Sequence, residues 1–243
     1  MKLLLSTHSK NEKYVDLCIT IITELWPEAP ELIVCTNKGS FSYQDRVISA
    51  HKDWVPMMED CINQLVAAGR IPEEEPIVLV LEDHIPHAAI NNKTILQLAD
   101  FLRTSGDSYL NLGGYGKGRQ KIADVDGTSV YAMDLHTFSS LHPAIWSVQH
   151  FRRTLSNALE SGISDPWRFE RIRLARTCHY TTGSKIWPST HGGFLWQGKV
   201  NVPALKHMKQ GSSLLLRRQL FMKLILEIPA RISERLLAGR LLP

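Results

Sequence analysis

Residues 76–81 form an uninterrupted apolar run, Pro-Ile-Val-Leu-Val-Leu, that leads directly into Glu82, Asp83 and His84. Such a run, without polar alternation, is typical of a strand covered by helices on both faces in a parallel sheet. It therefore favours a layered α/β fold. In open sheets of this kind ligands bind beyond the carboxyl ends of the strands. We expect the acidic turn after residue 81 at the mouth of a binding site.

The segments around this run alternate between strand and helix patterns. Further strands are predicted by apolar runs, and helices by apolar residues at helical spacing. The strands fall at residues 2–8, 31–36 and 108–112, and the helices at residues 11–26, 50–68 and 92–104. The first half of the chain thus has the order β-α-β-α-β-α-β, which predicts an open, mostly parallel sheet flanked by helices.

The second half is less regular. We expect a glycine-rich, basic loop over residues 113–127, a strand at residues 129–133, and helices at residues 149–159 and 166–177. A hinge at residues 211–213 precedes a basic, amphipathic helical tail. The predicted organisation is one α/β domain over residues 1–210 and a C-terminal helical extension over residues 211–243.

Composition excludes several classes of protein. The chain has 243 residues, 44% of them hydrophobic and 21% charged, which is ordinary for a globular protein. Its four cysteines lack the paired spacing of zinc or redox motifs, so reduced thiols are expected. No stretch approaches the roughly 20 apolar residues of a membrane span, and the short apolar run at the N-terminus is too brief for a signal peptide. These features predict a cytoplasmic protein.

The tripeptide Glu82, Asp83 and His84 offers two carboxylates and an imidazole at the end of a strand. Oxygen ligands suit Mg²⁺ or Mn²⁺, and an imidazole shifts the preference toward Mn²⁺. Because side chains alternate along a strand, Glu82 and His84 are expected on one face and Asp83 on the other.

Two blocks resemble a known family. The strand ending in Glu82, Asp83 and His84 resembles the D-x-D region of GT-A nucleotide-sugar glycosyltransferases, with glutamate at the first position. Residues 141–146 (Leu-His-Pro-Ala-Ile-Trp) and 165–170 (Asp-Pro-Trp-Arg-Phe-Glu) are similar to a pattern of uncharacterised bacterial capsule and surface-glycan transferases. The resemblance covers about residues 1–205. It implies a Rossmann-type GT-A-like fold, a nucleotide-diphosphate sugar as donor, and Mn²⁺ or Mg²⁺ bound by Glu82, Asp83 and His84.

The resemblance also implies roles for individual residues. Glu170 would be the general base of an inverting hexosyltransferase-like enzyme, acting on a glycan or lipid-linked acceptor in polysaccharide biosynthesis. The aromatic rings expected to stack on sugar are those of Trp146 and Trp167. Residues expected to contact the nucleotide or its diphosphate are Ser6, Thr7, Glu82, Asp83 and Lys199. Lys117 and Arg119 would contact the diphosphate or line the acceptor mouth.

Each motif also has a plainer interpretation. An acidic tripeptide after a strand can be a solvated loop or a helix cap. Glu170 can pair with Arg173 on a helix surface, and tryptophans are often core residues. Two other functions also stay open: a catalytically inactive GT-A-like scaffold, and a nucleic-acid-binding module that uses the basic tail. The second has no recognisable reading motif, so no nucleic-acid partner is expected.

The tail supplies the excess positive charge of the chain: from residue 217 onward it has six Lys or Arg and two Glu, and the formal net charge of the whole chain is +4. Apolar and basic residues alternate over residues 212–240, interrupted by Pro229. This pattern is typical of a helix that lies on an anionic membrane surface, here the inner membrane. The alternative is docking on the protein's own core or on a second copy of the chain in a homodimer.

Overall fold

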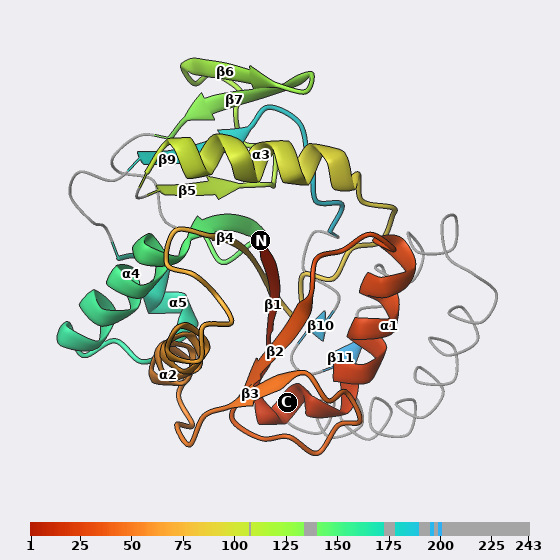
Figure 1. Cartoon of the computed structure of the whole chain (residues 1–243), viewed down its shortest axis with the longest axis vertical. Coiled ribbons are helices and arrows are strands. Elements are labelled where there is room, and N and C mark those ends of the chain that lie inside the picture. Colours follow the sequence, from red (N-terminus) through yellow and green to blue (C-terminus); the bar gives the residue numbers. More distant parts are fainter. Residues whose placement is uncertain (107, 134–139, 173–177, 190–194, 197–198, 201–243) are drawn as a thin grey trace, which may run out of the picture.

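The computed structural model describes residues 1–106, 108–133, 140–172 and 178–189, and the backbone of residues 195–196 and 199–200 (Figure 1). The boundary expected near residue 210 and the whole basic tail lie outside the described residues. None of the described helices is long and apolar enough to cross a membrane.

The described residues form one nine-stranded sheet with the order β3-β2-β1-β4-β8-β5-β9-β7-β6. β7 and β8 run against the other seven strands. The strands are β1 (Lys2–Ser6), β2 (Leu32–Thr36), β3 (Arg46–Ile48), β4 (Pro76–Leu81), β5 (Ser108–Asn111), β6 (Lys121–Val125), β7 (Thr128–Ala132), β8 (Ala144–Ser147) and β9 (Cys178–Thr182). A separate antiparallel pair joins β10 (Leu195–Trp196) to β11 (Lys199–Val200).

Helices cover both faces of the sheet (Figure 1). They are η1 (Ser9–Tyr14), α1 (Val15–Leu25), α2 (Trp54–Ala67), α3 (Asn92–Thr104), α4 (Val148–Glu160) and α5 (Pro166–Phe169). α1 and α3 pack on one face, with Leu3 and Leu5 of β1. α2, α4 and α5 pack on the other, with Leu4. This arrangement confirms the predicted class, a Rossmann-type, mostly parallel open sheet flanked by helices.

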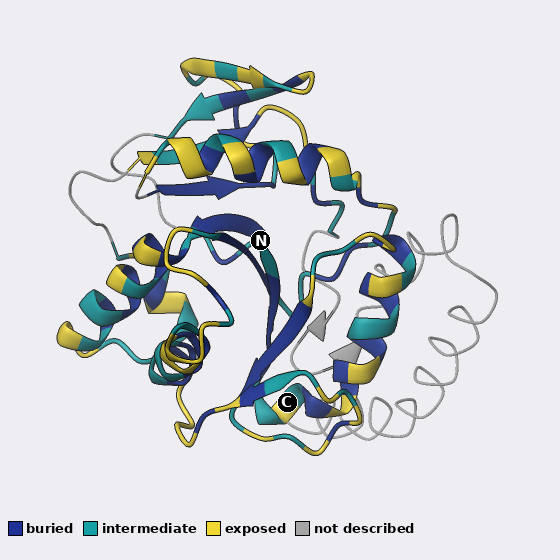
Figure 2. Cartoon of the chain, viewed as in Figure 1, coloured by how far each residue is buried: buried dark blue, intermediate teal, exposed yellow. Residues whose placement is uncertain are grey.

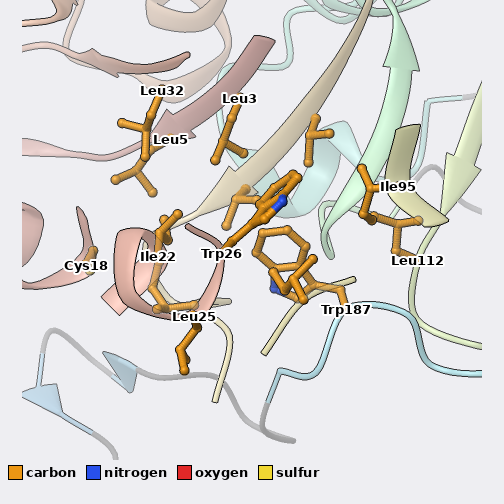
Figure 3. Close-up of a cluster of buried hydrophobic side chains, with 14 of the residues drawn as sticks. Leu3, Leu5, Cys18, Ile22, Leu25, Trp26, Leu32, Ile95, Leu112 and Trp187 are labelled. Atoms are coloured by element: carbon orange, nitrogen blue, oxygen red, sulfur yellow. The ribbon is translucent and has the colours of Figure 1, made fainter. Parts of the chain in front are cut away.

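The central strands are buried on both faces, as the apolar run at residues 76–81 predicts (Figure 2). On the α1 side, the rings of Trp26 and Trp187 meet edge to face with centroids 5.8 Å apart (Figure 3). The indole nitrogen of Trp187 donates to the carbonyl of His84 at 2.9 Å. The core therefore anchors the turn that carries the acidic residues.

Several predicted elements differ from the structure. The helix expected over residues 166–177 is the short α5, which ends at Phe169; residues 173–177 lie outside the described part. The loop expected over residues 113–127 contains β6, which pairs with β7 across a tight turn at Asp126 and Gly127. The short strands β3, β8 and β9 were not expected from periodicity.

Candidate functional site

A cavity of about 500 Å³ opens at the carboxyl ends of β1 and β4, on the edge of the sheet predicted for a ligand. One wall is the turn Glu82, Asp83 and His84 after β4. The opposite wall includes Trp167 and Glu170 of the α5 region. The cavity thus brings together the two sequence blocks that carry the family resemblance.

The acidic turn is not an extension of the strand. β4 ends at Leu81, and the backbone N–H of His84 donates to the carbonyl of Leu81 at 2.9 Å, which closes a tight turn. The alternation predicted for these side chains is therefore wrong, because the chain leaves the extended conformation at the first of them. All three residues line the same cavity.

The two carboxyls of the turn differ in exposure: the side chain of Asp83 is 33% exposed, and that of Glu82 is largely buried. Glu82 is 9% exposed, and its Oε1 accepts a hydrogen bond from the side-chain amide of Asn11. Burial, together with the nearby charge of Asp83, raises the pKa of Glu82 to about 8. Burial also raises the pKa of Asp83. Two adjacent carboxyls, one buried and one half-buried, disfavour full ionisation, so this wall suits a positively charged ligand.

His84 is a neutral imidazole beside these carboxyls. Burial, with a smaller contribution from the charge of Lys185, lowers the pKa of His84 to about 4. Its Nε2 lies 3.7 Å from Oδ1 of Asp83, and its ring meets the ring of His142 edge to face at 4.5 Å. A neutral imidazole retains a lone pair and can act as a metal ligand.

Buried polar atoms without a described partner gather at this edge of the sheet. They are Oδ1 of Asn11, after β1, and Oδ1 of Asp83 and Nδ1 of His84, after β4; all three residues line the cavity, and none of these atoms has a hydrogen-bond partner among the described residues. Since buried polar atoms in native proteins are nearly always paired, such a concentration marks a place where a ligand or ion completes the bonding.

The turn fits a divalent cation only in part. Its donor set of carboxylate oxygens and a neutral imidazole suits Mg²⁺ or Mn²⁺. Yet no group of three or more His, Cys, Asp or Glu residues within the described chain is arranged to hold an ion. The residues therefore fit an ion held by one or two protein ligands and completed by phosphate oxygens, as is common for Mg²⁺, rather than a dedicated protein cage.

Glu170 is fixed by the chain segment that faces it. The backbone N–H of Leu141 donates to its Oε1 at 2.6 Å, and the hydroxyl of Ser140 donates to the same oxygen at 3.2 Å. Within the described residues its second oxygen, Oε2, accepts no hydrogen bond. The alternative partner Arg173 lies outside the described part. Glu170 thus combines an anchored oxygen with one that can accept a proton at the cavity wall.

The two tryptophans of the motif have different environments. Trp167 is 74% exposed and lines the cavity, so its ring can stack on a sugar. Trp146 has no exposed surface, and its ring packs against Tyr109 and Phe151 in the core. The predicted substrate-binding role of Trp146 is therefore wrong, because β8 is buried between its neighbours and its side chain faces α4.

Several other predicted residues lie away from the cavity. Ser6 and Thr7 are buried behind it, where the hydroxyl of Ser6 accepts from the indole N–H of Trp54 at 2.9 Å. Lys117 and Arg119 do not line it. The side chain of Lys199 is outside the described part.

The structure adds residues that the sequence analysis missed. His8, Asn11, Lys52 and His142 line the cavity. The hydroxyl of Tyr115 lies 3.0 Å from Nδ1 of His142. His8 and Asn11 follow β1, just as the acidic turn follows β4. Their position after a strand could therefore have predicted a place in the site. The other three carry no local signal in the sequence.

The glycine-rich loop carries Tyr115 and packs firmly. The N–H of Tyr115 donates to the hydroxyl of Thr181 at 3.2 Å, and the N–H of Gly116 donates to the carbonyl of Thr182 at 3.2 Å. These bonds tie the loop to the end of β9. The loop is therefore fixed beside the site, which it contacts through Tyr115 and His142.

The fold and the site define a class: an α/β protein with a ligand cavity at the carboxyl ends of a mostly parallel sheet. No protein-family profile matches the sequence, and no curated protein matches it significantly. Twenty-six solved chains do match.

One solved structure is a 4-diphosphocytidyl-2C-methyl-D-erythritol synthase, with a TM-score of 0.42, 11% identity, and coverage of 72% of this chain and 92% of that chain. Another is the 2-C-methyl-D-erythritol 4-phosphate cytidylyltransferase of Francisella tularensis, with a TM-score of 0.41, 11% identity, and coverage of 77% and 93% respectively. A likeness at this level concerns the overall fold, and the function proposed below rests on the cavity itself.

Proposed function

We propose that the chain is a glycosyltransferase that moves a sugar from a nucleoside-diphosphate donor to a hydroxyl of a glycan or lipid-linked acceptor. The observation that carries the proposal is the single cavity with Asp83 and His84 on one wall and Trp167 and Glu170 on the other. A transferase of this kind needs a site for a charged diphosphate beside an aromatic surface and a carboxylate base.

The donor is assigned to the β4 wall. Its two adjacent carboxyls, with the raised pKa of each, and the unpartnered atoms of Asp83 and His84 favour a cationic ligand. A divalent cation bound there would neutralise the charge that develops on the departing diphosphate. Asn11 holds Glu82 in place through its side-chain amide. Lys52 adds one positive side chain to the lining, which suits phosphate oxygens.

The acceptor is assigned to the α5 wall. Trp167 offers an exposed ring for the face of a sugar, and Glu170 stands beside it. The acceptor oxygen forms a bond to the anomeric carbon while the bond from that carbon to the diphosphate breaks. The proton of the acceptor hydroxyl passes to Glu170, and the nucleoside diphosphate leaves with the electron pair. Glu170 would act through Oε2, since Oε1 is held by Leu141 and Ser140.

A thermal-shift screen of nucleoside diphosphates, with and without Mn²⁺, tests the donor assignment. A ligand at 100 times its dissociation constant should stabilise the chain by about 2.7 kcal/mol. We expect stabilisation that depends on Mn²⁺. No stabilisation by any diphosphate would contradict the proposal. Binding without turnover, measured by mass spectrometry over a panel of sugar donors and acceptors, would favour the inactive scaffold.

The wider setting is proposed from the sequence alone. A role in surface-polysaccharide synthesis follows from the resemblance of residues 141–146 and 165–170. Attachment to the cytoplasmic face of a membrane follows from the basic pattern of residues 212–240. Both stay predictions, since the tail lies outside the described residues.

A further inference from the structure

The half of the cavity assigned to the acceptor is strongly acidic. Three carboxylates line it, from Asp53 before α2, Asp165 before α5, and Glu170 after α5. Among the described lining residues, Lys52 is the single Lys or Arg. An anionic ring placed between these carboxylates meets like charge on several sides, and a cationic one meets attraction.

The three carboxylates are not equally engaged. The side chain of Asp165 caps α5 by accepting the N–H of Arg168 at 2.9 Å. Glu170 accepts from Ser140 and Leu141. Asp53 stands at the N-cap of α2, yet its side chain makes no capping hydrogen bond. Asp53 is exposed and lines the cavity, so its oxygens are accessible to a ligand. A carboxylate accepts hydrogen bonds well from sugar hydroxyls or from an ammonium group.

A second cavity of about 590 Å³ shares Ser140, Trp167 and Glu170 with the first and adds Arg171. Arg171 belongs to the second cavity alone, so the first, which contains Asp53, Asp165 and Glu170, has no arginine among its described lining residues. The two cavities thus adjoin at Ser140, Trp167 and Glu170, and they differ in charge: Asp53 and Asp165 line only the first, and Arg171 lines only the second.

We propose that the sugar ring accepted between Asp53 and Trp167 carries no negative charge, and that an amino substituent on this ring strengthens its binding. This inference rests on the proposed function and names the acceptor class for the same site. The Trp167 ring contacts the face of the sugar, and the exposed carboxylate of Asp53 binds its hydroxyl or ammonium group. A uronic acid is disfavoured, because its carboxylate would enter the same acidic space.

Three matched probes test the charge preference: the methyl glycosides of glucose, glucosamine and glucuronic acid. Binding to the full chain is followed through the indole N–H signal of Trp167 in nuclear magnetic resonance spectra, identified by its absence in Trp167→Phe. One charge contact at about 4 Å changes affinity by about fivefold in water-like surroundings. We expect the glucosaminide to bind at least about fivefold more tightly than the glucuronide, with the glucoside between them, and the difference to shrink in high salt.

Two variants locate the source of the preference. Asp53→Asn keeps the size of the side chain and should bring the affinities of the amino and neutral glycosides together. Arg171→Gln should leave the order of the three probes unchanged. The inference is overturned if the glucuronide binds as tightly as the glucosaminide or more tightly, or if no glycoside changes the Trp167 signal. It is also overturned if Asp53→Asn leaves the order of affinities unchanged, or if the chain prefers the glucuronide and loses that preference in Arg171→Gln.

The same spectra recorded with UDP and Mn²⁺ separate this inference from the proposed function. If the chain binds no nucleoside diphosphate but ranks the glycosides as expected, the donor assignment fails and the acidic sugar site stands. If the chain binds UDP with Mn²⁺ but prefers the glucuronide, the donor assignment stands and this inference fails.

Discussion

Glu170 serves two purposes at once. One of its oxygens holds the backbone of Leu141 and the hydroxyl of Ser140, and the same carboxyl stands at the wall of the cavity beside Trp167. The position of Glu170 is thus compatible with two interpretations, a purely structural role and a role as a general base. Substitutions that keep or remove the anchored oxygen can separate them.

Glu170→Gln retains a carbonyl oxygen for Ser140 and Leu141 but cannot take a proton. We expect this variant to bind nucleoside diphosphate normally and to lose about two to four orders of magnitude in transfer rate. Glu170→Ala should in addition lower the free energy of unfolding by roughly 1–3 kcal/mol, because a buried N–H loses its acceptor. Steady-state kinetics and urea unfolding measure the two effects. Normal transfer by the glutamine variant would make Glu170 purely structural.

Asp83→Asn and His84→Ala should each abolish nucleotide binding that depends on Mn²⁺ while leaving the fold intact. Each substitution removes a metal ligand whose buried atom has no hydrogen-bond partner among the described residues. Calorimetric titration of UDP in the presence of Mn²⁺ measures the loss. Asp100→Asn is the matched control, because Asp100 pairs with Arg103 on the exposed side of α3. If both turn variants bind UDP as the unmodified chain does, the metal assignment fails.

At the scale of single elements, the glycine-rich loop depends on one close backbone approach. Gly114 has φ +81°, and a Cβ there would lie 2.6 Å from the backbone nitrogen of Lys185. Gly118 has φ +78° with no atom within 4 Å of such a Cβ. An alanine at either position would have a strained backbone, because φ is positive. Only at Gly114 would its Cβ also clash with another segment, the backbone of Lys185.

Gly114→Ala should therefore lower the free energy of unfolding by roughly 1–3 kcal/mol more than Gly118→Ala, the matched control. The same change should move Tyr115 away from His142. Urea unfolding of both variants, with spectra of the His142 ring, tests this. Equal destabilisation by the two alanines would show that the contact with Lys185 is easily relaxed.

The elements with strong periodicity were predictable. The apolar run of β4 and the amphipathic pattern of α3 gave the observed bounds, Pro76–Leu81 and Asn92–Thr104. β3 and β8 are too short to show a period, and β8 is recognisable only from its pairing between β4 and β5. The β6–β7 hairpin did carry a signal, the Asp-Gly pair at residues 126–127, which the glycine-rich surroundings obscured.

The site was predictable where it followed a strand end and unpredictable where it needed tertiary pairing. Glu82, Asp83 and His84 were found because parallel strands present their carboxyl ends to ligands. Trp146 and Trp167 belong to the same resemblance, and their sequence context does not distinguish a core ring from an exposed one. Lys52 and His142 reach the cavity only through the packing of α2 and the segment before β8.

At the scale of the whole molecule, a buried histidine of α4, His150, contacts a half-buried histidine of β9, His179. Nε2 of His150 lies 3.1 Å from Nε2 of His179. Burial lowers the pKa of His150 to about 3, with a further contribution from His179, and burial lowers that of His179 to about 4, from an ordinary value of 6.5. The folded state thus favours both rings neutral, while the unfolded chain takes up protons below about pH 6.5.

Stability from this pair should be fully present above about pH 6.5 and should be lost as the pH falls toward 4. Each ring adds up to about 1.4 kcal/mol per pH unit to the slope of unfolding free energy against pH. His179→Gln removes one titrating ring and should make the slope between pH 6.5 and 4.5 shallower. Urea unfolding across this range measures both slopes, and identical slopes would exclude the pair as an acid-sensitive element.

The single reversed strand between β4 and β5 has a consequence for how the chain reaches its final form. β1 to β4 can pair among themselves once residue 81 has been made, but β5 finds its neighbours only in β8 and β9, which come 33 or more residues later in the order of synthesis. Until then the edge of β4 that pairs with β8 and both edges of β5 stay open, which favours self-association. The cavity closes with the same late segments, because Glu170 and Trp167 arrive after β8. A growing chain would thus gain its ligand site only when the sheet is complete.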